Sequence, residues 1–424
     1  MKHSIVILSW RSFDRAPEPY ARLRTFPDCR RGELVLKRIL PQRRDRMILL
    51  PAIGSQLIVT AGLFLMPLLI DTLEAHAQLS ARTAGFLLSL ELAASALTTL
   101  CLSAWARNHS ARHWALAGGL LAIVATAFTL ISPVLPALFA SRLLAGIGAG
   151  IVGAEAMSVL SRAVDRERLI AILTIVAIVD AAFWLAVLPY MIDRLGYRAP
   201  YIGLLLICMV GTYWLRRLPS PSTRAAVVLP ASRIPFALPA VLAVAAVFLT
   251  QLGQGAFWSM EETYGRSAGF NHHTIGIVLS AATLLLLLGA VAAAWAGNRF
   301  GRFTTLFILV ALNALSILFV STIPVHWVYV AANVLQSITN LSSVIYQLAL
   351  AASLDRMGRA VAVSTALVTL GNGIGPGLSA ILSAAYGASS VGMLVLAFNA
   401  VALGLYCMVR LRAMAGAQVT APLT

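Results

Sequence analysis

The sequence predicts an all-α membrane protein with twelve transmembrane helices in two pseudo-symmetric six-helix bundles. Of its 424 residues, 59% are hydrophobic and only 11% are charged, whereas an ordinary soluble domain carries about 25% charged residues. Apolar runs of about 20 residues, long enough to cross a bilayer as helices, recur from Met47 onward. Most of the arginines lie in the short segments between these runs.

Each predicted helix is an apolar run bounded by polar, charged or turn-forming residues. The first bundle is expected over residues 47–217 and the second over residues 235–410. The predicted helices of the first bundle are 47–70, 83–104, 114–132, 136–160, 168–190 and 199–217. Those of the second bundle are 235–257, 274–296, 303–322, 325–351, 360–385 and 388–410.

Three segments lie outside the two bundles. Residues 218–234 form the longest polar break between apolar runs, and their prolines and serines predict a cytosolic linker. Residues 411–424 are expected to form a cytosolic tail. Residues 1–46 are basic and lack a long apolar run, which predicts a disordered cytosolic tail, although a true start at Met47 is an equally acceptable interpretation.

The basic residues also predict how the chain crosses the membrane. The formal net charge is +16, and the arginines concentrate in the alternate loops that a cytoplasmic N-terminus places inside the cell. The opposite loops hold only Arg82, Arg194, Arg198 and Arg266. Both termini are therefore expected in the cytoplasm. The sequence shows no basic surface interleaved with aromatic residues, so nucleic-acid binding is not expected.

Short motifs recur in the two halves of the chain. Asp165-Arg166 precedes the fifth predicted helix and Asp355-Arg356 precedes the eleventh, 190 residues apart. The basic loops after the second and eighth helices show a similar offset. Such offsets indicate two related six-helix halves, with chance alignment of short basic loops as the alternative.

These loops resemble those of the major facilitator superfamily, whose motif G-x-L-a-D-R-x-G-R follows the second helix and recurs after the eighth. The recurrence here is the stretch 297–302, GNRFGR, with Asn298 in place of the usual aspartate. The first copy is degenerate, because Arg107 occupies the aspartate position. Arg142 begins a match to R-x-x-x-G-x-G of helix four, and residues 254–265 resemble a helix-seven segment of a poorly characterised bacterial subgroup.

The resemblance implies a central cavity between the bundles, a multi-pass protein of the plasma membrane (the bacterial inner membrane) and secondary transport of a small solute. It also implies latches between helix ends on the inner face. The residues expected in these latches are Arg107, Arg112, Asn298, Arg299, Gly301, Arg302, Asp355 and Arg356.

Ionisable residues inside predicted helices are the candidates for proton coupling. Counting about 1.5 Å of rise per residue places Glu91, Arg142 and Asp180 at similar depth, where one arginine could pair with two carboxylates and exchange a proton. A static buried network is the alternative. Glu155 lies deeper, toward the inside, where it either lines the cavity or meets a cytoplasmic arginine.

A second group of residues is the candidate solute site. The tenth predicted helix carries a polar face, and the seventh adds two glutamines, a tryptophan and an acid near the outer surface. The residues expected to contact solute are Gln56, Gln251, Gln254, Trp258, Glu262, Asn333, Gln336 and Asn340. Hydrogen bonding between helices is the alternative for the polar face, and an interfacial anchor is the alternative for the tryptophan.

The expected function is secondary transport of a small organic solute by alternating access, coupled to protons, with efflux favoured over uptake by symport. A receptor or sensor that kept the fold but lost transport is the rival hypothesis.

The sequence contains no GxxxxGK[ST] motif, so ATP hydrolysis is not expected. The helices contain no nucleophile–base set, so enzyme activity is not expected either. No cofactor or metal is expected, because His272 and His273 lie in a solvated outer loop with no acid or cysteine to complete a metal set. The expected partners are solute, proton and lipid bilayer, and the protein is expected to be a monomer.

Overall fold

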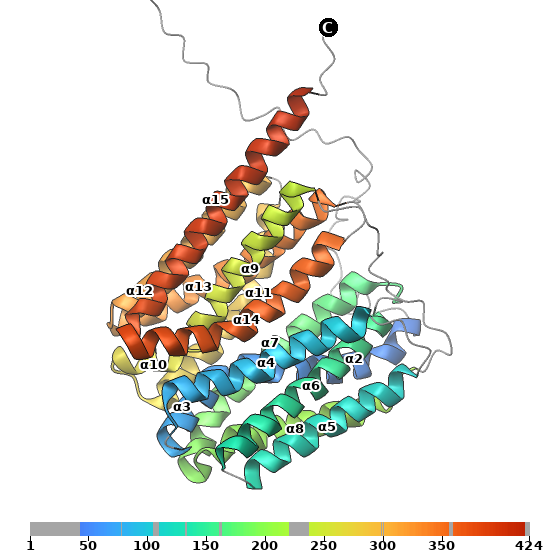
Figure 1. The fold of residues 1–424 in the computed structure, drawn as a ribbon, viewed down its shortest axis with the longest axis vertical. Coiled ribbons are helices and arrows are strands. Elements are labelled where there is room, and N and C mark those ends of the chain that lie inside the picture. Colours follow the sequence, from blue (N-terminus) through green and yellow to red (C-terminus); the bar gives the residue numbers. More distant parts are fainter. Residues whose placement is uncertain are drawn as a thin grey trace, which may run out of the picture.

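The computed structural model describes residues 43–77, 79–104, 110–131, 134–160, 163–219, 237–297, 299, 301–355 and 359–419. Within these ranges every regular element is a helix, and twelve helices are long and apolar enough to span a membrane. The predicted fold class and the predicted number of membrane helices are therefore confirmed. Figure 1 shows the helices gathered in two groups, one from each half of the chain.

Each half contributes six candidate membrane spans and one short helix that follows its first span. The helices of the first half are α2 (Arg43–Phe64), α3 (Met66–Ala77), α4 (Ala81–Ala104), α5 (Ala111–Ile131), α6 (Leu135–Leu160), α7 (Arg166–Leu195) and α8 (Arg198–Leu215). The helices of the second half are α9 (Leu238–Trp258), α10 (Glu261–Ser267), α11 (His272–Ala296), α12 (Arg302–Thr322), α13 (His326–Leu354), α14 (Arg359–Tyr386) and α15 (Ser389–Val419).

The first and last described helices of the chain extend into the segments predicted to be tails. α2 begins at Arg43, before residue 47, and α15 continues to Val419, past residue 410. Most of the predicted linker and most of the N-terminal segment lie outside the described residues.

The first predicted membrane helix is interrupted at Leu65, between α2 and α3. Pro67 explains the interruption, because its ring nitrogen has no hydrogen to donate to the carbonyl of Leu63 four residues earlier. The helix restarts at Met66 and runs to Ala77. The first span of the second half is also followed by a break and a short helix, without a proline, where α9 ends at Trp258 and α10 begins at Glu261.

The two halves meet along two pairs of helices. α4 packs against α14, and α7 packs against α11. α4 and α11 are the second spans of their halves, and α7 and α14 are the fifth spans. Exchanging the halves therefore exchanges the two interfaces, which is the pseudo-twofold symmetry that the sequence predicts.

Equivalent glycines build both interfaces. A Cβ on Gly85 would lie 2.8 Å from the carbonyl oxygen of Pro376, and a Cβ on Gly276 would lie 2.6 Å from that of Leu185. An offset of 191 residues relates Gly85 to Gly276 and Leu185 to Pro376. A side chain would not fit at either glycine, so its absence lets the backbones of the two halves approach closely.

Each of these glycines belongs to a repeated motif. The motif T-x-G-x-x-x-S occurs at residues 83–89 and at residues 274–280. Its serine contacts the other half in both copies: Gly377 N–H donates to Ser89 Oγ at 2.6 Å, and Ser280 Oγ donates to the carbonyl of Ala182 at 2.7 Å. The motif therefore marks where the second span of each half crosses the opposite half.

The contacts between the halves gather toward the end of the molecule that carries α3 and α10, which we call the closed end (Figure 1). There Trp258 Nε1, in the last turn of α9, donates to the carbonyl of Leu63 at 2.9 Å. Pro67 has left that carbonyl without a helical donor. A tryptophan of one half thus binds a carbonyl that a proline has freed in the other.

Candidate functional site

A buried ion pair lies between α4 and α6 of the first half. Arg142 is fully buried, and its Nη1 donates to the Glu91 carboxylate oxygens at 3.3 and 3.5 Å. Its Nη2 donates to Thr129 Oγ1 at 2.7 Å, and its guanidinium lies 5.0 Å from the centre of the Tyr201 ring. Together the ion pair, the hydrogen bond and the cation–π contact explain how a membrane helix holds an arginine.

The other two acids predicted for proton coupling lie apart from this pair. Asp180, in α7, is half-buried and hydrogen-bonded to Trp184. α7 packs on α2, α8 and α11, whereas α6 packs on α2, α4 and α5. Depth alone placed Asp180 beside Arg142, but the partner of its carboxyl is Trp184, one turn further along the same helix. Glu155 is fully buried in α6.

The polar face predicted for the tenth membrane helix is buried in the second half. α13 contacts α9, and Thr250 Oγ1 of α9 donates to Gln347 Oε1 of α13 at 3.3 Å. The other buried amides of these two helices are Gln251, Gln254, Asn333 and Gln336. Asn340 of α13 and Gln56 of α2 are half-buried.

Three of the buried amides have an atom without a hydrogen-bond partner among the described residues. These atoms are Gln254 Oε1, Gln336 Nε2 and Gln347 Nε2. By contrast, Gln251 Oε1 accepts from Asn372 Nδ2 at 3.0 Å. An unpaired buried polar atom costs about 1–3 kcal/mol. Unpaired amides on two neighbouring helices therefore indicate a place where water or a solute supplies the missing hydrogen bonds.

Glu261, which the sequence analysis did not select, is a fully buried carboxyl at the start of α10. Its Oε2 accepts from Asn333 Nδ2 at 3.2 Å, and its Oε1 has no partner among the described residues. Burial raises the pKa of Glu261 to about 8. The helix-seven motif pointed to the neighbouring Glu262, and only the packing of α10 against α13 distinguishes the two acids.

Asn333 and Arg142 occupy the same position of the internal repeat. The offset of 191 residues that relates the two interface glycines also relates these two residues. Each binds a buried carboxylate, Arg142 that of Glu91 and Asn333 that of Glu261. In each half, therefore, a polar side chain of the fourth span holds a carboxylate of another helix.

Comparison with known families agrees with this architecture. The Major Facilitator Superfamily model matches residues 52–244 and residues 243–422, once for each half. The chain belongs to the major facilitator superfamily. No curated relative matches its sequence.

Solved transporters share the major facilitator superfamily fold with this chain. A bacterial homologue of the human lysosomal transporter Spinster, in an inward-facing and unoccupied conformation, has a TM-score of 0.67 at 13% identity, over 86% of this chain and 96% of that one. The nucleoside transporter NupG has a TM-score of 0.65 at 13% identity, over 86% and 98%. The peptide transporter POT has a TM-score of 0.63 at 15% identity, over 90% and 98%. At these identities the likeness shows the fold alone.

In this major facilitator superfamily protein a charged cluster joins the halves at the closed end. Asp71 of α3 forms an ion pair with Arg266 of α10. His272 Nδ1, at the start of α11, lies 2.8 Å from Glu262 and 3.5 Å from Asp71. Arg266 also lies 3.6 Å from Glu262. We call these four residues the closing cluster.

The closing cluster and the tryptophan hydrogen bond join the same stretch of each half. An offset of 195 residues relates Asp71 to Arg266, and the same offset relates Leu63 to Trp258. Both pairs are in contact. These contacts join the end of the first span and the short helix after it in one half to the same elements of the other half.

The prediction that the two histidines lie in a loop is wrong, because they begin α11, and their side chains are 39% and 33% exposed. His272 contacts two carboxylates, and His273 Nε2 lies 2.9 Å from Asp193 of α7. The expectation that no acid could complete a metal set is also wrong, because ligand atoms of Asp71, Glu262 and His272 all lie within 4.8 Å of one another. These acids come from α3, α7 and α10, and only the fold brings them to the histidines.

The residues predicted as inner latches are described only in part. Arg107, Asn298 and Arg356 lie outside the described residues. Arg112 is exposed, and the Arg299 guanidinium lies 5.0 Å from the centre of the Trp295 ring. Gly301, with φ of 76°, precedes Arg302 at the start of α12, and Asp355 Oδ2 accepts from Ala360 N–H at 3.0 Å. The latches stay a prediction.

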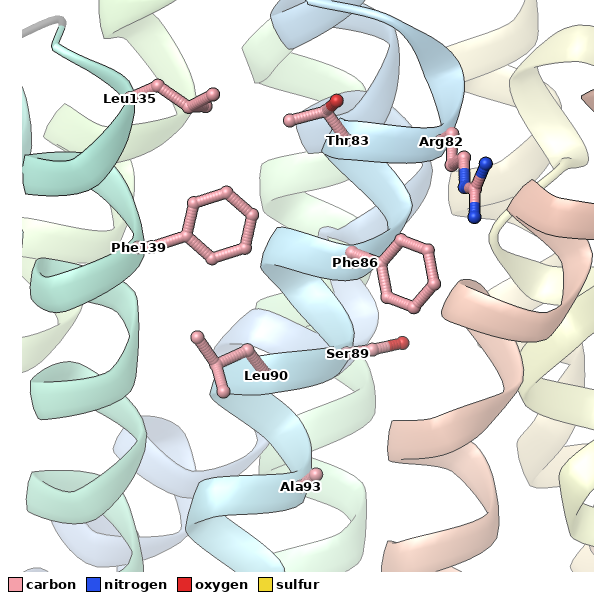
Figure 2. Close-up of a pocket in the computed structure, with 8 residues that line it drawn as sticks. All are labelled: Arg82, Thr83, Phe86, Ser89, Leu90, Ala93, Leu135 and Phe139. Carbon is pink, nitrogen blue, oxygen red and sulfur yellow. The ribbon is translucent and has the colours of Figure 1, made fainter.

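A hollow of about 580 Å³ lies against α4 and α6 of the first half (Figure 2). Its walls come from α4 and α6, and they are mainly apolar: Arg82, Thr83, Phe86, Ser89, Leu90, Ala93, Leu135 and Phe139. Phe86 and Leu135 are exposed, so the hollow opens on the outer surface of the bundle. None of the residues predicted to contact solute lines it.

Proposed function

We propose that this protein is a proton-coupled secondary transporter that carries a small organic solute by alternating access. The observation that carries the proposal is the set of unpaired, buried amides on α9 and α13. They offer both donors and acceptors at the polar face predicted to line the cavity. A solute with hydroxyl, amide or carbonyl groups would supply the hydrogen bonds that the helices leave unmade.

The Glu91–Arg142 pair supports coupling to protons. Protonation of Glu91 would remove its attraction for Arg142, leaving Thr129 and the Tyr201 ring as the partners of the guanidinium. Such a change of partners at a crossing of two helices can link proton binding to helix movement. Asp180, Glu155 and the buried Glu261 are further acids on which a proton could bind.

The proposed orientation places both termini in the cytoplasm of a bacterial inner membrane and the closed end outside. The conformation described here would then be sealed toward the outside. Efflux in exchange for protons is the proposed direction, because a pathway lined by acids and amides suits neutral or cationic solutes. We further propose that the protein acts as a monomer, without a cofactor and without enzyme activity.

Reconstitution into proteoliposomes tests this function. Cells that lack and overproduce the protein are first screened for a solute whose accumulation changes, and that solute is loaded into the vesicles. The expected result is solute flux that moves protons and responds to an imposed pH gradient. Glu91→Gln should remove the proton movement, whereas Glu167→Gln, at an exposed acid of α7, should keep it.

Two outcomes count against the proposal. Flux that continues with normal proton movement in Glu91→Gln contradicts the coupling role of the ion pair. A protein that binds a solute but moves none supports the rival hypothesis of a receptor or sensor on the same fold.

A further inference from the structure

The closing cluster contains a set of metal ligands contributed by both halves. Asp71 comes from α3 of the first half, and Glu262 and His272 come from the second half. Their ligand atoms all lie within 4.8 Å of one another. Two ligands about 2 Å from one ion cannot lie more than about 4 Å apart, so a small movement of side chains suffices for shared coordination.

An unpaired carboxylate oxygen provides an independent reason to expect a ligand at this place. The Glu262 side chain is only 2% exposed, and its Oε2 has no hydrogen-bond partner among the described residues. A buried carboxylate oxygen without a donor is costly. A cation that Glu262 binds through both oxygens, or through Oε2 alone, would remove this cost.

The local charge also favours a cation. Asp71, Glu74 and Glu262 bring three carboxylates to this end, and Arg266 is the arginine that acts on Asp71 and Glu74. One arginine therefore does not balance the negative charge that the fold gathers here.

We propose that Asp71, Glu262 and His272 form a binding site for a divalent transition-metal ion that bridges the two halves and holds this end closed. One imidazole and two carboxylates suit Zn²⁺ and its neighbours in the first transition row better than Mg²⁺ or Ca²⁺, which prefer oxygen ligands only. Because the ligands come from both halves, the set is complete only while the closed end is closed.

Arg266 competes with the metal ion for the same carboxylates. Its side chain is 41% exposed, so it can turn toward water and leave Asp71 and Glu262 to the metal. An ion that binds only the closed arrangement favours that arrangement by the factor 1 + [M]/Kd, which is about 100-fold at one hundred times Kd.

The test uses the purified full chain in detergent, prepared without a polyhistidine tag, and titrates Zn²⁺ by calorimetry. The expected result is one Zn²⁺ per chain and a higher Tm in its presence, with no comparable effect of Mg²⁺. Asp71→Asn and His272→Gln, which remove one ligand from each half, should each weaken binding by at least about tenfold.

Two matched variants separate a metal site from a simple salt bridge. Arg266→Gln breaks the same ion pair as Asp71→Asn, yet it should tighten Zn²⁺ binding, because it removes the competing cation. His273→Gln should leave binding unchanged, since His273 pairs with Asp193 instead. Absence of stoichiometric Zn²⁺ binding by the unaltered protein overturns the proposal, as does equal loss in His272→Gln and His273→Gln.

The closing role rests on the proposed function and is read out separately. Zn²⁺ added to the side of the closed end should slow solute flux in the unaltered protein and not in His272→Gln. Zn²⁺ binding with unchanged flux would overturn the closing role while leaving transport intact. Absence of flux under every condition would instead contradict the proposed function, and calorimetry would still decide the metal site.

Discussion

Arg142 is held by contacts from three other helices. Its two terminal nitrogens bind Glu91 of α4 and Thr129 of α5, and its guanidinium lies over the ring of Tyr201 of α8. The Glu91 side chain keeps 13% of its surface exposed, whereas that of Arg142 keeps none. The carboxylate is therefore the member of the pair that water or a proton can reach, and the arginine is the member that depends on it.

Removal of Glu91 alone should destabilise the protein more than removal of both charges. Glu91→Gln leaves a buried guanidinium without its counter-ion, which costs about 3–5 kcal/mol, whereas Glu91→Leu combined with Arg142→Met removes both charges. We expect a clear fall in Tm for the single variant and recovery of most of it in the double variant. Arg217→Gln, at an exposed arginine, is the control. Equal Tm values for the single and double variants would show that the pair contributes little.

The buried amides should separate into structural and solute-binding residues. Gln336→Met removes an amide whose Nε2 is unpaired, so stability should be unchanged or slightly higher, while solute affinity falls. Gln251→Met removes the acceptor of Asn372 and should cost about 1 kcal/mol. Tm and solute binding are measured on both variants. A loss of stability in Gln336→Met larger than that in Gln251→Met would contradict the assignment.

The sequence predicts some of these residues and not others for a physical reason. Steps of three and four along one helix place Asn333, Gln336 and Asn340 on one face, and the structure buries Asn333 and Gln336 against α9 and α10. The burial of Glu261 could not be predicted in this way, since it depends on a seven-residue helix packed against a distant segment. A helical pattern shows which residues share a face, but not what that face meets.

At the scale of helices, prolines recur where helices meet. Pro67, Pro189 and Pro376 each leave a carbonyl four residues earlier without a helical donor. In each case a neighbouring helix comes close to that carbonyl: Trp258 donates to that of Leu63, Gly276 packs on that of Leu185, and Gly255 packs on that of Asn372. Close approach of a tryptophan N–H or a glycine Cα compensates for the missing helical bond. These prolines therefore mark helix contacts, although only Pro67 lies at an interruption, since α7 and α14 continue through Pro189 and Pro376.

Gly276→Ala should open the closed end. The new Cβ would lie 2.6 Å from the carbonyl of Leu185, so α7 and α11 must separate, at a cost of about 1–3 kcal/mol to the closed arrangement. Hydrogen exchange of α3 and α10 should become faster. Gly404→Ala in α15, where nothing lies within 4 Å of the added Cβ, should leave exchange unchanged. Equally slow exchange in both variants would show that this crossing does not hold the halves together.

The sequence contains a second repeat, besides the basic loops, that relates to the interfaces between the halves. The motif T-x-G-x-x-x-S at residues 83–89 and 274–280 is an internal repeat at the offset of 191, and it marks both interfaces. The basic loops suggested nearly the same offset, but they say nothing about contacts. The partner helices α7 and α14 are unrelated to the motif in sequence, so no pattern within α4 or α11 could identify them.

At the scale of the whole molecule, the contacts between the halves gather at one end. The two glycine crossings, the Trp258–Leu63 hydrogen bond and the closing cluster all lie toward α3 and α10 (Figure 1). In a transporter that works by alternating access these contacts must break once in each cycle. A covalent bond across one of them should therefore stop transport without disturbing either half.

Ser89 and Gly377 offer the place for such a bond. A Cβ on Gly377 would lie 3.4 Å from Ser89 Cβ, close to the separation of about 3.5–4.5 Å in disulfides. In a background without the four native cysteines, Ser89→Cys with Gly377→Cys should form a disulfide on oxidation, lose solute flux and regain it on reduction. Gly119→Cys with Thr212→Cys, whose Cβ atoms would be 3.2 Å apart within the first half, should cross-link and keep its flux. If the bond between the halves forms and flux persists, the closed end does not open during transport, because no solute could pass through an end that is covalently shut.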